Sequence, residues 1–346
     1  MSAKMGIAAK DPEPGDGEAV MDGDGAIALS ARRIPIPGSI SPAAQDFLRS
    51  QSAPRRQYPA PQDIAGWRSL IDFYDRTFAE IMAPKLQAIG AKVERTTING
   101  VSVHVGSPPL APGQAEAWVN LSFHGGALVF SGGALVATDA AMGVHRTGCR
   151  TFALDYRMPP DHPFPAGLED CITAYRGLLE RYAPARIVVS GRSAGGNLAA
   201  AMILRLRELA LPLPGAAILL TPEVDLTESG DSFQTLRGID VVLKSGLPEA
   251  NALYARGHDL SDPAISPLFG DFTKGFPPTL IQSGTRDLFL SNSVRMHRAL
   301  RAAGVEAELH VWEAMPHGDF GGFTPEDKEL WAELRSFLAR HRANRS

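Results

Sequence analysis

The sequence has few cysteines, no block of basic residues and no long apolar run, and each absence excludes a class of protein. Its two cysteines, Cys149 and Cys171, lack the number and spacing of a disulfide scaffold or a zinc site. With 34 basic and 38 acidic residues the formal net charge is -4, which does not favour nucleic-acid binding. No apolar run reaches the ~18 residues of a spanning helix, and the N-terminus has no secretion-signal pattern. We therefore expect a cytoplasmic protein with buried thiols, no metal site, no nucleic-acid partner and no stable membrane insertion.

What remains is a composition typical of a soluble globular protein, with 44% hydrophobic and 21% charged residues. Residues 1–30 are rich in Pro, Gly and acidic side chains, which predicts a mobile arm. Apolar residues then recur at helical spacing from Ser41 and again from Ile64 to Met82, which predicts two amphipathic helices, each with a Ser or Asp cap. The dipeptide Asn99-Gly100 between two alternating segments predicts a β-hairpin.

After the hairpin, short apolar runs alternate with helical segments to the end of the chain. The strand candidates are AWVNLSF, TFALDY, ARIVVSG, AAILLTP, TLIQSG and AELHVW. This alternation predicts βαβ units, and hence an α/β fold with a mostly parallel sheet. Residues 225–269 interrupt the alternation with Gly, Pro and one helix near Pro248 to Tyr254, and we interpret them as an insertion above the sheet.

Residues 191–195, Gly-Arg-Ser-Ala-Gly, stand between a β-branched strand and an Ala/Leu-rich helix. The G-x-S-x-G pattern is weak in a chain with 34 glycines, but this context is the one that a nucleophilic serine on a sharp strand-to-helix turn requires. We predict Ser193 as the nucleophile. The alternative is a glycine-rich turn that only links strand to helix.

A second motif, His124-Gly125-Gly126-Ala127, follows the earlier strand WVNLSF. It corresponds to the H-G-G-G loop whose backbone N–H groups, with the N–H of Ala194, stabilise an oxyanion. Gly125, Gly126, Ala127 and Ala194 are therefore the candidate oxyanion donors. The alternative is a structural glycine loop, and for His124 itself we favour such an anchoring role.

The acid and the base are expected after later strands, in that chain order. Asp287 follows TLIQSG and His317 follows AELHVW, whereas the other downstream histidines lie in helical, strand or inserted segments. We predict His317 as general base and Asp287 as the acid that orients it. Asp319 is too close to His317 in sequence to occupy a separate loop, and the alternative role of Asp287 is a helix N-cap.

The motifs HGGA, GRSAGG, YRMPPDHPFPAGLED and MPHG closely resemble the hormone-sensitive-lipase group of bacterial carboxylesterases over residues 95–335. Within this group the segment RRIPIPGSISPAAQDFL is most similar to esterases and ε-lactone hydrolases. The resemblance implies an α/β-hydrolase fold with a mostly parallel eight-stranded sheet flanked by helices. It also implies an N-terminal helical cap over 31–90, joined by part of 225–269, and a catalytic domain over 91–346.

The resemblance further implies hydrolysis of short- to medium-chain acyl esters without a cofactor, with oxyanion donors at Gly126, Ala127 and Ala194, and it suggests a homodimer. The matching segments Asp155 to Arg157 and His162 to Pro165 are structural in the group. Three positions depart from its pattern: Ala127 for glycine, Arg192 for aspartate, and LFLS after Asp287 in place of a second acid.

Two alternative functions are known for proteins of such a fold. A lactone or amide hydrolase would share the triad, because the triad does not determine the leaving group. A non-catalytic ligand receptor on this fold is disfavoured by the presence of His317. Trp67, Phe73 and Tyr74 are candidates for an acyl pocket, although core packing explains them equally well.

Overall fold

The computed structural model describes residues 33–51, 57–109 and 118–343, together with short stretches between 20 and 29. The chain divides into two compact units, Met1–Pro37 and Gly38–Ser346. In the first unit β1 (Val20–Met21) pairs antiparallel with β2 (Ile27–Ala28). Most of the predicted mobile arm, residues 1–30, lies outside the described residues, so that interpretation stays a prediction.

The second unit is built on an eight-stranded sheet in the order β10-β9-β8-β7-β5-β6-β4-β3. The strands from β10 to β6 run parallel, and β4 and β3 add antiparallel strands at one edge. The strands are β3 (Lys92–Ile98), β4 (Val101–Ser107), β5 (Val119–Phe123), β6 (Arg150–Leu154), β7 (Ile187–Arg192), β8 (Ala216–Leu220), β9 (Thr279–Gly284) and β10 (Ala307–Trp312). The predicted mostly parallel α/β sheet is therefore confirmed.

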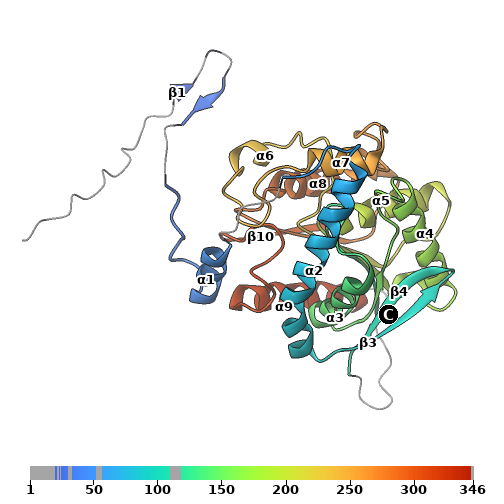
Figure 1. The fold of residues 1–346 in the computed structure, drawn as a ribbon. Coiled ribbons are helices and arrows are strands. Elements are labelled where there is room, and N and C mark those ends of the chain that lie inside the picture. Colours follow the sequence, from blue (N-terminus) through green and yellow to red (C-terminus); the bar gives the residue numbers. More distant parts are fainter. Residues whose placement is uncertain are drawn as a thin grey trace, which may run out of the picture. The chain divides into compact units, whose positions relative to one another are not determined.

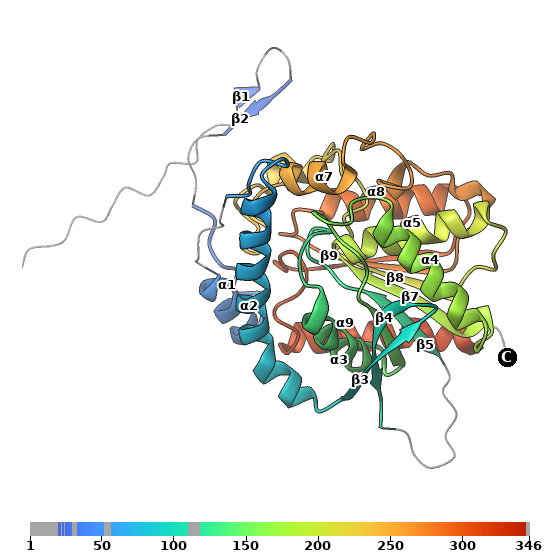
Figure 2. The same ribbon diagram turned by 45° about the vertical axis from the view of Figure 1, so that its right-hand side comes forward.

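Helices cover both faces of this sheet (Figures 1 and 2). One face carries α3 (Val136–Thr147) and α9 (Pro325–Ala343). The other carries α4 (Ala166–Leu179), α5 (Ala194–Glu208) and α8 (Leu290–Ala302). Because both faces are covered, the central strands are buried except at Arg192, the last residue of β7. This burial explains why their sequences are mainly continuous apolar runs rather than alternating ones.

Short elements fill the connections between these layers. The stretch 225–269 holds α6 (Ser232–Thr235) and α7 (Pro248–Ala255), as predicted for the helix in this region. Single 3-10 turns are η1 (Gly133–Leu135), η2 (Pro184–Arg186), η3 (Pro267–Phe269) and η4 (Phe272–Lys274). The predicted hairpin is present, with Asn99 and Gly100 both at positive φ between β3 and β4.

Two helices precede the sheet, α1 (Pro42–Ser50) and α2 (Ile64–Ile89). Ser41 caps the first by accepting from the N–H of Ala44, and Asp63 caps the second by accepting from the N–H of Gly66. The apolar pattern indicates α2 only as far as Met82, but the helix continues through Pro84. Proline removes one backbone hydrogen bond without forcing the chain out of helical φ, and α2 ends at Gly90, where φ is 63°.

Both cysteines are buried, as expected from the sequence. Within the described residues, no group of three or more His, Cys, Asp or Glu side chains has the arrangement of a metal site. In the same part of the chain, we find no helix with the length and hydropathy needed to span a bilayer.

Candidate active site

Ser193 occupies the tight turn between β7 and α5. Its backbone lies at φ 56° and ψ -123°, a conformation that costs a non-glycine residue roughly 1–3 kcal/mol. The Ser193 side chain is buried, and its backbone carbonyl accepts from the N–H groups of Gly196 and Asn197. The turn therefore holds the serine at the N-terminus of α5, where the helix dipole favours negative charge.

The glycines of this turn are required by close backbone contacts. A β-carbon on Gly195 would lie 1.9 Å from the carbonyl oxygen of Phe123, and one on Gly191 would lie 2.0 Å from that of Gly195. Both neighbours are backbone atoms, which cannot rotate out of the way. The glycines of the G-x-S-x-G pattern are thus required by the close packing of the turn against β5. A flexible linker between strand and helix would not require glycine at these two positions.

The loop after β5 lies against the same turn. A β-carbon on Gly125 would stand 3.3 Å from Cβ of Ser193, and Gly126 has φ 118° with Phe130 packed too close for a side chain. Within the described chain, no hydrogen bond occupies the N–H groups of the four candidate donors, which are Gly125, Gly126, Ala127 and Ala194. Unpaired N–H groups beside a serine are the feature that an oxyanion site needs.

His124 lies in this loop but is held in the interior. Its Nδ1 is 2.8 Å from the carbonyl oxygen of Gly125, and its ring stacks on Tyr156 at 4.2 Å between centroids. The Tyr156 hydroxyl donates to the carbonyl of His124 at 2.8 Å. Burial lowers the pKa of His124, which favours the neutral ring. These contacts agree with an anchoring role.

Asp287 and His317 come together from the loops that follow β9 and β10. Nδ1 of His317 is 3.0 Å from Oδ1 of Asp287, and the carboxylate is fully buried. Asp287 also accepts from the Ser283 hydroxyl at 2.7 Å and from the N–H of Phe289 at 3.0 Å. The carboxylate is thereby fixed in position, with Oδ1 beside the imidazole of His317.

The competing interpretations of these residues do not fit their contacts. Helix α8 begins at Leu290 without a side-chain cap, so Asp287 is not its N-cap. Asp319 pairs with Arg146 at 3.4 Å and accepts from the N–H of Gly321 at 2.8 Å, and no hydrogen bond joins it to His317 in the described residues. The hydrogen bond to the imidazole of His317 is made by Asp287.

Asp240, in the segment between α6 and α7, contacts both loops of the candidate site, and the sequence did not reveal this. Its fully buried carboxylate accepts hydrogen bonds from four backbone N–H groups. Those of Val242 and Leu243 donate to Oδ1, and those of Leu288 and His317 donate to Oδ2. It thus joins the insertion to both loops that carry the acid and the base. The only sequence signal is an isolated Asp in an apolar stretch, which gives no indication of distant partners.

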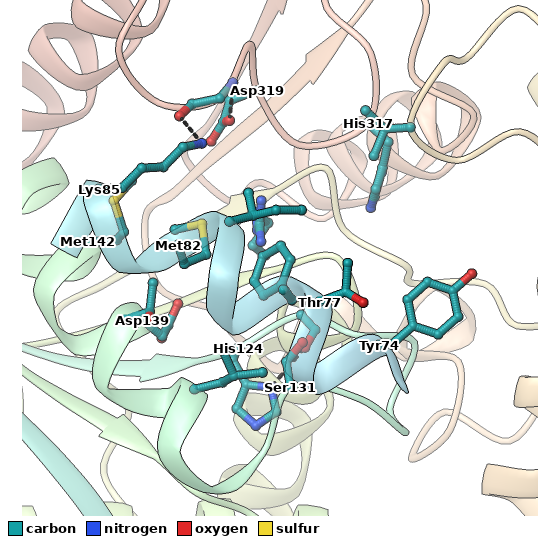
Figure 3. A pocket seen from close by; sticks show the side chains of 18 of the residues that line it. Tyr74, Thr77, Met82, Lys85, His124, Ser131, Asp139, Met142, His317 and Asp319 are labelled. Carbon is teal, nitrogen blue, oxygen red and sulfur yellow. Dashed lines mark hydrogen bonds between the residues drawn. The ribbon is translucent and has the colours of Figure 1, made fainter. Parts of the chain in front are cut away.

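A pocket of about 500 Å³ opens beside these groups, and Figure 3 shows the side chains that surround it. Tyr74, Thr77 and Met82 project from α2, while His317 belongs to the loop after β10. Apolar side chains of α3 and of the turn before it, both of which pack against α2, continue this wall. The pocket therefore lies between α2 and the carboxyl ends of the strands.

Ser193 and His317 are not hydrogen-bonded to each other in this structure. Ser193 is 8% exposed and does not itself line the pocket, although its neighbours Gly125 and Arg192 do. His317 reaches the same pocket and packs edge-on against Phe289, 4.8 Å between ring centroids. Such contacts are often long in a site without substrate and shorten in the reactive complex.

The aromatic residues predicted for an acyl pocket divide between two environments. Tyr74 lines the pocket, whereas Trp67 is fully buried against Tyr58 and Phe130 in the core. Phe73 packs edge-on against Tyr74 and does not line the pocket. The apolar wall is instead continued by residues one and two turns further along α2, from Thr77 to Met82.

A strand-to-helix serine turn, an N–H-rich loop and an acid–base pair at the carboxyl ends of parallel strands are the expected features of one family. The model of the α/β-hydrolase fold matches residues 120–320. The chain belongs to the α/β-hydrolase fold family. Because that match covers more than half of the sequence and includes Ser193, Asp287 and His317, the assignment does not depend on a single motif.

Curated and solved proteins refine this assignment. An acetyl-hydrolase of Streptomyces hygroscopicus is 38% identical over 172 residues, which are 49% of this chain and 57% of that protein. The crystal structure of an esterase superposes with a TM-score of 0.85 at 36% identity, covering 91% of this chain and 98% of that one. An esterase of the bacterial hormone-sensitive lipase family gives 0.70 at 32% identity, with 88% and 99% covered. The resemblance to hormone-sensitive-lipase-like carboxylesterases is confirmed.

Proposed function

We propose that this α/β-hydrolase cleaves carboxylic esters with short to medium acyl chains, using Ser193, His317 and Asp287. One observation supports this most directly: the 3.0 Å hydrogen bond between Asp287 and Nδ1 of His317. Such a bond favours the tautomer with its proton on Nδ1, which leaves Nε2 free to accept a proton from a hydroxyl. The relatives described as an acetyl-hydrolase and as esterases support an ester as the substrate.

In the proposed first step, Oγ of Ser193 forms a bond to the ester carbonyl carbon while its proton passes to Nε2 of His317. Asp287 stabilises the resulting imidazolium without taking the proton. His317 then gives this proton to the departing alcohol oxygen, and an acyl-enzyme remains. A water molecule attacks the acyl carbon, loses its proton to Nε2, and the acid is released as Ser193 regains its hydrogen.

The negative charge on the carbonyl oxygen develops beside the unpaired backbone N–H groups of Gly126, Ala127 and Ala194. Their positions are fixed before substrate arrives, so little reorganisation is needed in the transition state. The substitution of alanine for the third glycine of the motif keeps the N–H group. Ala127 adopts φ 53°, a strained conformation, and its neighbours Gly126 and Leu128 are also at positive φ.

The volume and lining of the pocket limit the size of the substrate. Phe78, Ile81, Met82, Leu135 and Met142 give it an apolar wall, and its volume of about 500 Å³ suits a small ester. We propose that α1, α2 and part of 225–269 act as a cap over the catalytic domain, since residues from all three segments line this pocket.

The test compares hydrolysis of p-nitrophenyl acetate, butyrate, octanoate and laurate by the wild type and by Ser193→Ala. We expect wild-type turnover to be highest for acetate or butyrate, and Ser193→Ala to lose at least about 10³-fold in kcat. Ser261→Ala, at an exposed loop serine, is the matched control and should retain full activity. Equal activity of Ser193→Ala and the wild type would reject the proposal.

A further inference from the structure

The pocket wall carries a cation that the proposed reaction does not use. Arg192 is half-buried, immediately precedes Ser193 and lines the pocket. A β-carbon placed on Gly318, the residue after His317, would lie 3.2 Å from Nη1 of Arg192. The guanidinium therefore lies beside the loop that carries the general base, at the same end of the sheet as the nucleophile.

Arg192 has no protein partner in the described parts of the chain. No carboxylate lies within 4.0 Å of its guanidinium, and no hydrogen bond from it reaches another described residue. A solvent-exposed arginine needs no partner because water solvates it. A half-buried one in a pocket wall has lost part of that hydration, and its charge acts on whatever enters.

The other charged groups of the pocket do not neutralise the charge of Arg192. Four cationic side chains, Lys85, Arg146, Arg192 and Lys244, line the pocket with two carboxylates, Asp139 and Asp319. Asp319 pairs with Arg146, and Asp139 accepts from the Ser122 hydroxyl at 2.6 Å. The pocket lining thus has a surplus of positive charge.

Arg146 provides a second, independent observation. Its side chain is more than nine-tenths buried, and its Nε has no acceptor among the described residues. Burial lowers the pKa of Arg146. The nearby carboxylate of Asp319 opposes this shift, whereas the charge of Arg192 adds to it, so the two guanidinium groups are close enough to repel. An anion between the two guanidinium groups would offset that repulsion. It could also accept hydrogen bonds from the N–H groups of Arg192 and from Nε of Arg146.

We propose that Arg192, supported by Arg146, forms a carboxylate-binding subsite, so that the preferred substrates are small esters that carry a free carboxylate. This inference rests on the proposed ester hydrolysis and specifies its substrate class. Guanidinium groups bind carboxylates through paired charge-assisted hydrogen bonds, which supply orientation as well as affinity. The apolar side chains of α2 then face the uncharged part of the ester.

The carboxylate could belong to the acyl or to the alcohol part, and two matched pairs of substrates separate these sources. Monomethyl glutarate is compared with methyl pentanoate, and the acetate ester of 3-hydroxypropanoate with propyl acetate. Acid release is followed at constant pH to obtain kcat and KM for each ester. We expect the wild type to favour the charged member of one pair by about tenfold or more.

Arg192→Gln should lower that charged-to-neutral preference by about 10- to 100-fold, mainly through a higher KM for the charged ester. Arg192→Lys keeps the charge and should retain most of the preference. This variant also serves as a control, because a preference that it retains shows that replacement of Arg192 does not by itself disrupt the fold. Lys244→Gln removes another pocket cation, one that already donates to the Gln51 carbonyl, and should change the preference less than about threefold.

Two results would overturn the inference: a wild type that disfavours both charged esters, or equal changes in preference in Arg192→Gln and Lys244→Gln. In either case, intact hydrolysis of propyl acetate by the wild type and its loss in Ser193→Ala would leave the proposed esterase function standing. Loss of activity toward every ester would reject the esterase function itself.

Discussion

The two halves of the candidate site are built in different ways. The nucleophile half, Gly191 to Gly196 with Gly125, is fixed by neighbouring backbone atoms in direct contact. The acid–base half joins loops after β9 and β10, and Asp240 from a third segment holds both of them. The first half therefore depends on local geometry and the second on long-range hydrogen bonds, and the two should fail differently when mutated.

The largest effect is expected from Gly195→Ala in the nucleophile half. The added β-carbon would collide with the Phe123 carbonyl, so β5 and α5 must move apart. We expect loss of soluble folded protein or a drop of more than about 3 kcal/mol in the free energy of unfolding, measured by urea denaturation. Gly38→Ala, where nothing lies within 4 Å, is the control. Equal stability of the two variants would contradict the packing argument.

In the acid–base half, Asp287→Asn should lower kcat by roughly 10³- to 10⁴-fold with a nearly unchanged fold, because the wrong imidazole tautomer is then stabilised. Asp319→Asn breaks the pair with Arg146 and should cost less than about tenfold. Steady-state kinetics with p-nitrophenyl butyrate measures both. If Asp319→Asn were the more damaging variant, the assignment of the acid would be wrong.

Asp240→Asn should have a smaller effect on catalysis. The amide oxygen of the asparagine can accept hydrogen bonds from the N–H groups of Val242 and Leu243. Its NH₂ group would then face the N–H groups of Leu288 and His317 and could not accept a hydrogen bond from them. We expect kcat to fall about 10- to 100-fold with little change in KM, since the loops lose their alignment. Asp231→Asn, at an exposed position of the same insertion, residues 225–269, serves as control. A change confined to KM would argue against positioning.

The smallest effect concerns pH. Burial raises the pKa of Asp240 from 3.8 to about 6, so the folded protein binds this proton more tightly than the unfolded chain. This contribution to stability is complete below about pH 4 and is lost as the pH rises to about 6. Asp327, whose pKa burial also raises to about 6, acts in the same direction.

Asp240→Asn should therefore flatten part of the decline in unfolding free energy between about pH 4 and 6, by about 1–3 kcal/mol. Urea denaturation of the wild type and the variant at pH 4, 5, 6 and 7 measures this slope. Identical slopes would show that Asp240 does not titrate in this range.

The same comparison explains what could be predicted from the sequence. Strand-to-helix turns and glycine loops have local signatures, so Ser193 and the loop from Gly125 to Ala127 could be placed from the residues on either side of them. His317 and Asp287 could be chosen because their chain order and loop positions are restricted. Asp240 and the pocket residues beyond Tyr74 could not, because their roles arise from contacts between segments far apart in the chain.

Helix α2 shows a second limit of prediction from the sequence. Helical periodicity predicts α2, but not that it continues past Pro84. Nor can periodicity separate Trp67, which packs in the core, from Tyr74, which faces the pocket, since both occupy the apolar side of one helix. The direction of each side chain depends on what packs above the helix.

The central claim is that His317, held by Asp287, makes the hydroxyl of Ser193 nucleophilic. Its most direct test is the labelling rate of Ser193 by a fluorophosphonate, followed by intact mass and peptide mapping in the wild type and in His317→Ala. We predict one adduct, on the peptide that contains Ser193, and a rate at least about 10³-fold lower without the imidazole. An adduct on another residue, or equal rates in the two proteins, would contradict the account.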